Sequence, residues 1–489
     1  MISHLLLTAL FLATPIVGDA DALERGLAGI EATTIRADLE FLAADVMAGR
    51  DTPSDELEFA AGFLLNRVQR LGLTPGANGE WFQSYELQRS ALSEDCRLFL
   101  DWSKLSFELR PLEGFLWISC LRAEASISGT TVCIGDASKE SLAQLPDGIL
   151  EGRWALATSV PRMLQTTRRR LSRAGAVGLL VVPAEEPTDE EVVRLDRATE
   201  RTRSRLEPAD YELALDRSED EDAKQDFPIV QLLPATATQW LSVFGREQLL
   251  AGSVLELTVR EERRLETEVT SVRNLCALLP GTDPERAAEV IVCSAHYDHV
   301  GVRDDVIYPG ADDNASGTAG LLALAEALVT RGLLDRSVLF VWLSGEEQGL
   351  WGSKAFCTSV PLDPLLHVAM NLNLDMIGRT ASDELYITPS RDHEAFGPLS
   401  ELAYELSALE GFPVLQAQDE FYRASDHYNF ARILEVPTVF LSTGDHPDYH
   451  APGDTPDKID VEKLSRVVRL AARLVERMAT LELALPVAR

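Results

Sequence analysis

The sequence predicts an α/β fold with an open, mainly parallel sheet, and two observations support this. Four short apolar runs in the second half of the chain have the length of buried strands, and they begin at Glu289, Ser337, Met370 and Val436. A helical stretch, residues 315–328, separates the first two runs. Because the carboxyl ends of parallel strands meet at one edge of a sheet, the polar residues near these ends are expected to lie close together.

These polar residues are of the types that bind zinc. They are two imidazoles and three carboxylates: His296, Asp313, Glu347, Asp375 and His450. A single catalytic zinc takes three protein ligands and keeps one position open for water, so the set is too large for one ion. Two zinc ions that share one carboxylate would use the whole set. Three carboxylates and one hydroxide would also balance the four positive charges of two zinc ions.

Each of these residues also has an ordinary interpretation. A lone Asp or Glu at a strand end is often a helix cap or a solvated loop residue. Clustering favours a metal site, because the chain has eight histidines and two of them lie in the tetrapeptide His296–His299. The adjacent carboxylates Asp312–Asp313 and Glu346–Glu347 lie next to buried runs, where they would repel each other without a cation between them.

Five segments together resemble peptidase family M28, whose members are co-catalytic zinc peptidases and mostly aminopeptidases. The segments occur in the family's order and are His296–His299, Pro309–Gly317, Ser344–Ser353, Asn373–Met376 and Tyr449–Thr455. The resemblance implies a three-layer α/β/α zinc-exopeptidase fold with a mixed, mainly parallel sheet.

The resemblance also implies two Zn²⁺ ions as cofactors and assigns their ligands. Asp313 would bridge the two ions. One zinc would bind His296 and Asp375, and the other Glu347 and His450.

Three neighbouring residues fit the remaining catalytic roles. Asp298 could accept the far ring N–H of His296, although it could also be a plain loop residue. Glu346 is expected to be the general base that takes a proton from water and delivers it to the leaving amine. Tyr449 could donate its phenol to the oxyanion, with a packing role as the alternative.

A further segment resembles a family element that lies near the substrate. It contains Ser425, Asp426 and His427, which are candidates for substrate binding. The alternative is that they support the wall of the cleft. No cysteine follows Cys357, so this region lacks the disulfide found in secreted relatives and its rigidity must come from packing.

The amino-terminal residues predict export. Residues 1–20 look like a signal peptide, because the apolar stretch Leu5–Val17 is too short to span a bilayer and small residues follow it. The protein is therefore expected to be periplasmic or secreted, without stable membrane insertion after cleavage. The positive charge before the apolar stretch is weak, which leaves a retained amino-terminal anchor as the alternative.

Charge and cysteine content exclude other classes of function. Forty-five basic and 78 acidic residues give a net charge of −33, which argues against nucleic acid and anionic membrane surfaces as partners. Six cysteines show no spacing typical of a zinc finger, so they are not the metal site. Cys293 is expected to be a buried thiol, and pairing among Cys96, Cys120 and Cys133 stays open.

The chain after residue 20 divides into three parts. Residues 21–91 are a helical part of the peptidase domain, with Ile35, Leu39, Leu42 and Ala43 on one helix face. This part contains Met47–Asp51, which resembles a turn found in many relatives. Residues 265–489 are the catalytic domain.

An inserted domain is expected over residues 92–264. Its short β-rich runs, which resemble the protease-associated (PA) domain of some relatives, are Glu151–Ala157, Ala174–Pro183 and Phe227–Leu233. A helix is expected near Thr166–Arg173, and nothing in the insertion indicates catalysis. The run Pro187–Asp226 carries many charges of both signs, which predicts a mobile, solvated excursion.

The sequence therefore predicts an exported dizinc exopeptidase that hydrolyses the N-terminal bond of peptides. A carboxypeptidase of the same superfamily is one alternative, and Arg379 or Arg423 could then bind the substrate carboxylate. A non-catalytic binding protein on the same scaffold is the other, which the complete set of ligands disfavours.

Overall fold

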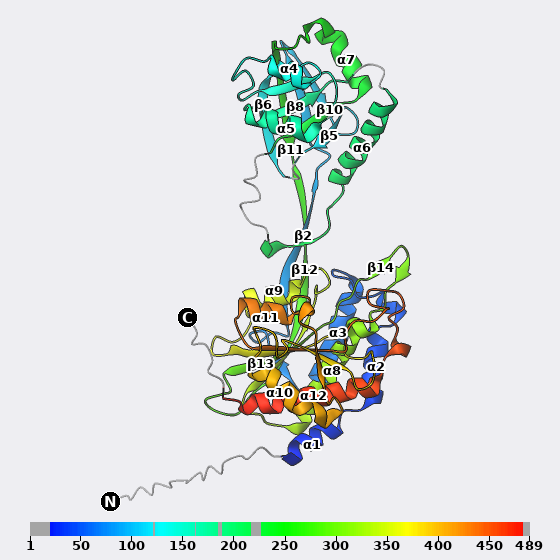
Figure 1. The fold of residues 1–489 in the computed structure, drawn as a ribbon, viewed down its shortest axis with the longest axis vertical. Helices are drawn as coiled ribbons and strands as arrows, with labels where there is room; N and C mark the ends of the chain where they lie inside the picture. The colour runs from blue at the N-terminus through cyan, green and yellow to red at the C-terminus, as the bar shows by residue number, and fades with distance from the viewer. Residues whose placement is uncertain (1–19, 121–122, 162, 184–187, 217–225, 483–489) are drawn as a thin grey trace, which may run out of the picture. The chain divides into compact units, whose positions relative to one another are not determined.

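A computed structural model describes residues 20–120, 123–161, 163–183, 188–216 and 226–482. Its chain forms two compact units (Figure 1). Unit 1 combines Met1–Tyr85 with Ser271–Arg489, and unit 2 is Glu86–Thr270. Residues 1–19 of the predicted signal peptide lie outside the described residues. In the part that the structure describes, no helix is long and apolar enough to cross a membrane.

A large mixed sheet forms the centre of unit 1. Its strand order is β19 (Leu415–Ala417), β18 (Leu385–Thr388), β20 (Thr438–Ser442), β17 (His367–Leu374), β13 (Glu289–His296), β16 (Ser337–Leu343), β12 (Leu265–Leu279) and β2 (Phe82–Leu92), and β1 (Thr74–Pro75) pairs with β12. The short strand β9 (Glu212–Leu213) belongs to unit 2 and pairs with residues 87 and 88 of β2. The central strands β20, β17, β13 and β16 are parallel to one another, whereas β18 and β12 run antiparallel to their inner neighbours. The predicted mixed sheet with a parallel centre is confirmed.

Helices cover both faces of this sheet (Figure 1). Side chains of a strand alternate between its faces. Ile291 and Cys293 of β13 therefore pack in one core, together with helices α2 (Ala32–Leu42), α3 (Asp55–Arg70), α8 (Gly317–Arg331) and α12 (Val461–Thr480). Val290 and Val292 pack on the other face, against α9 (Trp351–Thr358) and α11 (His427–Ile433). This is the predicted three-layer α/β/α arrangement.

The amino-terminal helices form as the apolar spacing predicts. Helix α1 (Ala20–Ala28) precedes α2, and the predicted face of α2 is buried: Ile35, Leu39, Leu42 and the following Ala43. Ser54 caps α3 by accepting a hydrogen bond from the Leu57 N–H, and acidic residues fill the first turn of that helix. The 3₁₀ turn η1 (Asp45–Met47) lies between α2 and α3.

Helical segments lie in the connections that follow the central strands. Helix α8 begins at Gly317, two residues after the predicted start, because the backbone of the preceding segment, η4 (Ala311–Ser316), is kinked and not helical at Asp313 and Asn314. Further along the chain, α10 (Pro398–Leu406) lies between β18 and β19. The apolar strands and these connections place the polar residues at one edge of the sheet.

Unit 2 contains the predicted β-rich runs. Its sheet has the order β4 (Leu105–Leu109), β3 (Arg97–Trp102), β11 (Val254–Arg263), β6 (Ala125–Cys133), β7 (Trp154–Ala157), β8 (Gly178–Val181), β10 (Ile229–Leu232) and β5 (Phe115–Ser119). The expected helix is α5 (Leu164–Arg173), and the unit also contains α4 (Lys139–Ala143), α6 (Asp189–Leu206) and α7 (Pro234–Phe244).

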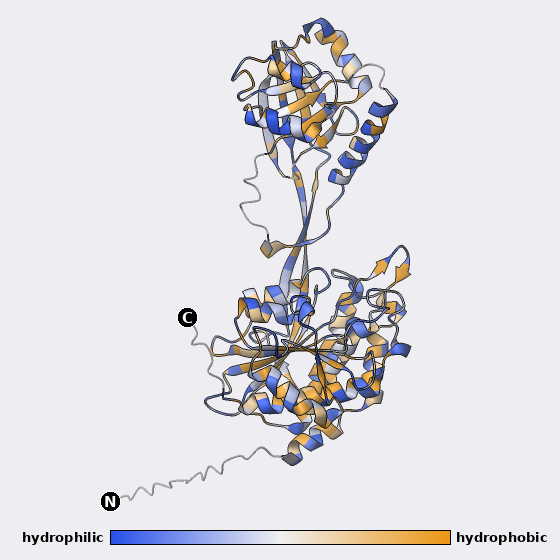
Figure 2. Cartoon of the chain, in the orientation of Figure 1, coloured by the Kyte–Doolittle hydropathy of each residue, from blue (hydrophilic) through white to orange (hydrophobic). Residues whose placement is uncertain are grey.

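Helix α6 (Asp189–Leu206) corrects the expectation for the charge-rich run Pro187–Asp226. Thr188 and Glu191 form a capping box at its start. The helix is mostly hydrophilic (Figure 2), yet Ala198 and Thr202 are buried, and Thr202 Oγ1 accepts a hydrogen bond of 2.9 Å from the Trp117 N–H. This part of the run is therefore a packed helix and not a solvated excursion. Residues 217–225 of the run lie outside the described residues.

All six cysteines are free thiols. Cys293 is fully buried in β13, as expected. The open possibility of a disulfide among Cys96, Cys120 and Cys133 is not realised in this structure.

Candidate active site

The carboxyl ends of the four central parallel strands carry the predicted residues. Strand β13 ends at His296, and Glu346–Glu347 follow β16. Asp375 follows β17, and His450 lies in the loop after β20. Asp313 joins them from η4, so the structure brings together all of the residues predicted to bind metal.

The first group of donor atoms comprises His296, Glu346 and Asp375. Their possible ligand atoms lie within 4.8 Å of one another. The Nε2 atom of His296 lies 3.2 Å from Asp375 Oδ1 and 3.4 Å from Asp313 Oδ1. These separations are close to those between ligands of one tetrahedral zinc, whose bonds are about 2.0–2.2 Å.

The second group surrounds Glu347. The Nε2 atom of His450 lies 2.8 Å from Glu347 Oε2 and 3.2 Å from Asp313 Oδ2. The Nδ1 atom of His299 lies 2.7 Å from Glu347 Oε1 and 3.6 Å from Asp313 Oδ2. Asp313 thus faces both groups, with Oδ1 toward His296 and Oδ2 toward the second group.

The pKa values of this cluster are shifted by burial and by the close contacts between its imidazoles and carboxylates. Burial works against ionisation of Asp313, but hydrogen bonding to His296 and the charge of His299 hold its pKa well below the usual value. Burial lowers the pKa of His450, but its close contacts with the carboxylates of Asp313 and Glu347 raise it to about 10. Burial and the neighbouring Asp375 raise the pKa of Glu346 well above its ordinary value, against the lowering effect of His296.

The donor set fits a divalent metal. Buried atoms without a hydrogen-bond partner in the described structure include Asp313 Oδ2, His299 Nε2 and His450 Nε2. Unpaired buried polar atoms are costly, and a cation bound between Asp313 and His450 would satisfy two of these atoms. Imidazole and carboxylate are ordinary zinc ligands, so two groups of residues here could each hold a metal ion.

Asp298 lies close to the His296 ring and also contacts Thr52 and Glu346. The nearest acceptor to His296 Nδ1 is the backbone carbonyl of Asp298 at 3.2 Å, and the Asp298 carboxylate is 3.6 Å away. That carboxylate accepts hydrogen bonds from Thr52 Oγ1 at 3.1 Å and from the Glu346 N–H at 3.2 Å. The predicted contact with the ring therefore competes with two other contacts, and its role stays a prediction.

Two further residues support the ligands. Ser425 donates a hydrogen bond of 2.7 Å to Asp375 Oδ2. Asp454 accepts hydrogen bonds from the backbone N–H groups of Asp312 at 2.9 Å and Asp313 at 3.1 Å. The sequence predicts no role for Asp454 or for His299, although two histidines within residues 296–299 were a signal for the latter.

Asp426, His427 and Tyr449 occupy different positions around the cluster. Asp426 and His427 are buried, and the His427 ring stacks on Phe440 with 4.8 Å between centroids. Burial raises the pKa of Asp426 to about 7 and lowers the pKa of His427 to about 3. Tyr449 is 45% exposed and stacks on His450 at 3.9 Å. Its proposed oxyanion contact and the substrate contacts of the 425–427 segment stay predictions.

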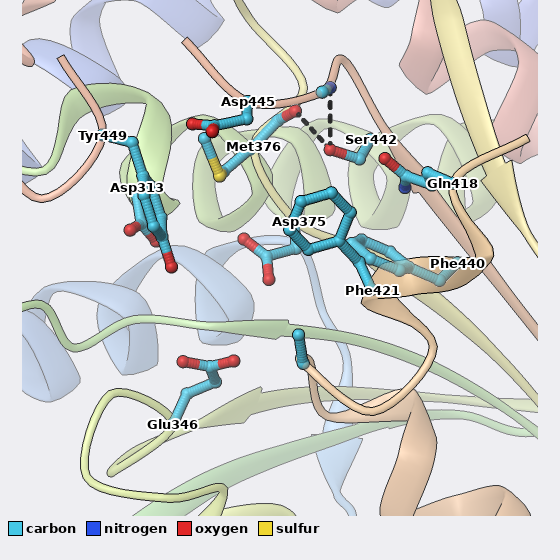
Figure 3. A pocket seen from close by; sticks show the side chains of 12 residues that line it. Asp313, Glu346, Asp375, Met376, Gln418, Phe421, Phe440, Ser442, Asp445 and Tyr449 are labelled. Carbon is cyan, nitrogen blue, oxygen red and sulfur yellow. Dashed lines mark hydrogen bonds between the residues drawn. The ribbon is translucent and has the colours of Figure 1, made fainter. Parts of the chain in front are cut away.

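A pocket opens beside the cluster. Figure 3 shows the carboxylates of Asp313, Asp375 and Glu346 on one side and the rings of Phe421 and Phe440 on the other. Met376 and Ala424 add apolar walls, and Gln418, Asp445 and Tyr449 also line it. Among the described residues that line this pocket, none is Arg or Lys.

The two arginines considered for a substrate carboxylate lie elsewhere. Arg379 donates a hydrogen bond of 2.8 Å to Asp448 and lies 3.6 Å from Asp454. Arg423 is exposed, and its guanidinium carbon lies 5.9 Å from the centroid of the Tyr428 ring. Neither lines the pocket.

The part of the chain that carries the cluster is similar to known proteins. Residues 274–475 match the model of Peptidase family M28. A probable leucine aminopeptidase of Arthroderma otae is 29% identical over 215 residues, which are 42% of this chain and 57% of that protein. Aminopeptidase YwaD of Bacillus subtilis is 28% identical over 196 residues, which are 38% of this chain and 40% of that protein. The alignments thus span about half the length of these curated relatives.

One solved structure is similar along most of the chain. It is an aminopeptidase from Aneurinibacillus sp. strain AM-1, with 20% identity, a TM-score of 0.49, and coverage of 96% of this chain and 98% of that chain.

Proposed function

Because residues 274–475 match the model of peptidase family M28, we propose that the protein is an exported zinc aminopeptidase with two metal ions. One observation carries the proposal. Asp313 points its two carboxylate oxygens at two separate groups of donors, with His296 on one side and His450 on the other. A shared carboxylate between two donor groups is what a site with two metal ions requires.

Five residues would hold the ions. His296 and Asp375 would bind one, Glu347 and His450 would bind the other, and Asp313 would bind both. When bound, zinc polarises the carbonyl of the scissile bond and favours loss of a proton from water.

The chain's own residues then move the protons. Glu346 accepts a proton from the attacking water and delivers it to the amine that leaves, and its raised pKa suits a group that must carry this proton between the two steps. Tyr449, on the rim of the pocket, can donate its phenol to the oxygen that becomes negative.

The pocket supports cleavage at the amino end of the substrate. A free α-amine is a cation, and Asp313, Glu346, Asp375 and Asp445 line the pocket. A carboxypeptidase needs a cation for the terminal carboxylate, whereas Arg379 is bonded to Asp448 away from the pocket. The curated relatives reported above are named aminopeptidases, which agrees with this choice.

The walls of the pocket support an apolar first residue. Phe421, Phe440 and Met376 offer aromatic and thioether surface to the side chain of that residue. We infer that leucine, methionine and phenylalanine are cleaved faster than aspartate or lysine. The name of the Arthroderma otae relative, a leucine aminopeptidase, agrees with this preference.

The experiment that tests the function compares three kinds of substrate. Leucine p-nitroanilide should be hydrolysed, its N-acetyl derivative should not, and an N-blocked peptide with a free carboxyl end should also resist. Activity should disappear after dialysis against a chelator and return with Zn²⁺. Release of a C-terminal residue from the blocked peptide would contradict the aminopeptidase assignment. Export is tested by locating the protein in cell fractions and sequencing its mature amino terminus, which the segment Leu5–Val17 predicts to lie near residue 21.

A further inference from the structure

The turn after η1 contacts three loops of the candidate active site. We propose that Arg50 and Thr52, within the segment Arg50–Thr52 that we term the N-terminal clamp, are positioning residues that hold these loops in the arrangement that binds metal. The proposal rests on the proposed metal site, but it concerns residues outside the ligand set. The contacted loops follow β13, precede α8 and follow β16.

Arg50 joins the loop after β13 to the loop before α8. Its side chain is fully buried, and its guanidinium donates hydrogen bonds to the carbonyls of Tyr297 at 2.9 Å, Pro309 at 2.9 Å and Gly310 at 3.0 Å. It also donates to the carbonyl of Leu42 at the end of α2. Tyr297 directly follows the ligand His296. An arginine has five N–H donors in a fixed plane, so this one group sets the separation of both loops.

The backbone of the clamp and of Gly49, the residue before it, adds two contacts to the same region. The carbonyl of Arg50 accepts a hydrogen bond of 3.2 Å from the His299 N–H, and the carbonyl of Gly49 accepts one of 3.2 Å from the Gly301 N–H. Gly49 has φ +71, and a Cβ there would lie 2.4 Å from the Tyr308 carbonyl oxygen. Glycine at this position therefore allows the close approach of the clamp to the loop.

Thr52 joins the loop after β13 to the loop after β16. Its hydroxyl donates a hydrogen bond of 3.1 Å to Asp298 Oδ2 and accepts one of 3.1 Å from the Gly345 N–H. Gly345 directly precedes the proposed base Glu346, whose own N–H is held by Asp298. A single buried hydroxyl thus fixes Asp298 and the start of the loop that carries Glu346 and Glu347.

Asp51 completes the clamp at the surface. Its Oδ1 atom accepts a hydrogen bond of 3.2 Å from Gln348 Nε2, one residue after the ligand Glu347. Residues 50–52 therefore contact all three loops: they bind residues next to the ligands His296 and Glu347, and a residue three positions before Asp313. Metal ligands must be held within about 0.5 Å of their productive positions, and groups behind the ligands provide this precision.

The charge of Arg50 has a second effect. Burial lowers the pKa of Arg50 to about 10, against the raising effect of Asp298 and Asp313, so the guanidinium is a cation at neutral pH. Its buried charge lies among carboxylates that repel one another when no metal is bound. Even before a metal binds, the clamp therefore keeps the loops in the arrangement that binds metal.

The test uses a pair of substitutions at Thr52. Thr52→Val keeps the shape of the side chain but removes the hydroxyl, whereas Thr52→Ser keeps the hydroxyl. Zinc affinity is measured on the full-length protein by competition with a chromogenic chelator, without substrate. Loss of a group that positions metal ligands typically weakens binding about 10–100-fold, which is the expected effect of Thr52→Val. Thr52→Ser should retain most of the affinity.

A matched control separates this effect from general damage. Thr74 also donates a hydrogen bond from its hydroxyl, in this case to the backbone carbonyl of Leu278 at 3.1 Å, but it lies on β1 away from the site. Thr74→Val should bind zinc like the unchanged protein. Zinc affinity of Thr52→Val equal to that of Thr74→Val would overturn the assignment of Thr52, as would equal losses in Thr52→Val and Thr52→Ser.

Arg50→Lys tests the other half of the clamp and stays informative if Thr52→Val does not fold. Lysine keeps the charge but cannot span the same carbonyls, so zinc affinity should fall by about 10–100-fold. Unchanged affinity in Arg50→Lys would overturn the role of Arg50. Failure of the unchanged protein to bind two zinc ions would instead contradict the proposed function, which keeps the two failures distinguishable.

Discussion

The Nδ1 atom of His299 lies 2.7 Å from the Oε1 atom of Glu347. The imidazole is fully buried and its Nε2 atom has no hydrogen-bond partner in the described structure. Both His299 and His450 therefore approach Glu347, although only His450 belongs to the predicted ligand set. A ring N–H at Nδ1 of His299 would orient the carboxylate of Glu347 without binding the metal.

His299→Gln should therefore weaken zinc binding less than His299→Leu, because an amide can still donate to Glu347. The loss in His299→Leu should be about 10–100-fold with two ions still bound at saturation. Metal analysis by mass spectrometry of the intact protein checks this. One ion bound by His299→Leu, together with two ions bound by His450→Ala, would mean that His299 is the ligand.

Asp313→Ala should lower the occupancy of both metal sites, because Asp313 lies 3.4 Å from His296 and 3.2 Å from His450. His450→Ala should lower mainly one, since His450 contacts only the second group. Zinc content at increasing free zinc concentration separates the two patterns. Equal losses in both variants would contradict the assignment of Asp313 as the shared ligand.

Glu346→Gln should lose turnover while two metal ions stay bound. The amide cannot accept a proton, and Glu347 still provides its carboxylate, so kcat should fall on the order of 10²–10⁴-fold. Kinetics on leucine p-nitroanilide and metal analysis of the same sample measure both properties. Turnover close to that of the unchanged protein would remove Glu346 from the mechanism.

Glu261→Gln should change how stability depends on pH in unit 2. Burial raises the pKa of Glu261 to about 7, although Arg263 lies 3.2 Å away, and the pKa of an unfolded Glu is about 4.3. Between these values the folded protein binds a proton that the unfolded chain has released. The free energy of unfolding therefore falls as pH rises through this window, by an amount on the order of 3 kcal/mol.

The glutamine variant has no such group, and its carbonyl can still accept the bond from the Trp117 indole that Glu261 accepts at 2.7 Å. Its unfolding temperature should decline less than that of the unchanged protein between pH 5 and pH 7, as measured by calorimetry. Glu262→Gln, at the next and more exposed position, is the control. Identical pH profiles for all three proteins would show that Glu261 does not bind a proton on folding.

The sequence was sufficient to predict the sheet and the residues at its edge. Apolar runs such as Ser337–Leu343 are buried along their whole length, so they are recognisable as strands. Parallel strands bring the residues that follow them to one edge of the sheet, and this does not depend on the conformation of the loops. The contacts of Asp454 and Ser425 could not be predicted, because they depend on where a backbone N–H or a distant carboxylate points after folding. Helix α6 was missed because its charges outweighed the few residues, Ala198 and Thr202, that pack against the sheet.

The division of unit 1 into two stretches of sequence has a consequence for how the protein is made. Helices α1–α3 and the N-terminal clamp precede Glu86, whereas β13, β16 and β17 all follow Ser271. A ribosome that adds ~5–20 residues per second needs on the order of ten to forty seconds for the stretch between them. During that time the apolar faces of α2 and α3, including Leu39 and Leu64, have no sheet to cover them. The nascent chain is therefore expected to expose these apolar faces until the residues after Ser271 have been made, and the candidate active site can form only after that.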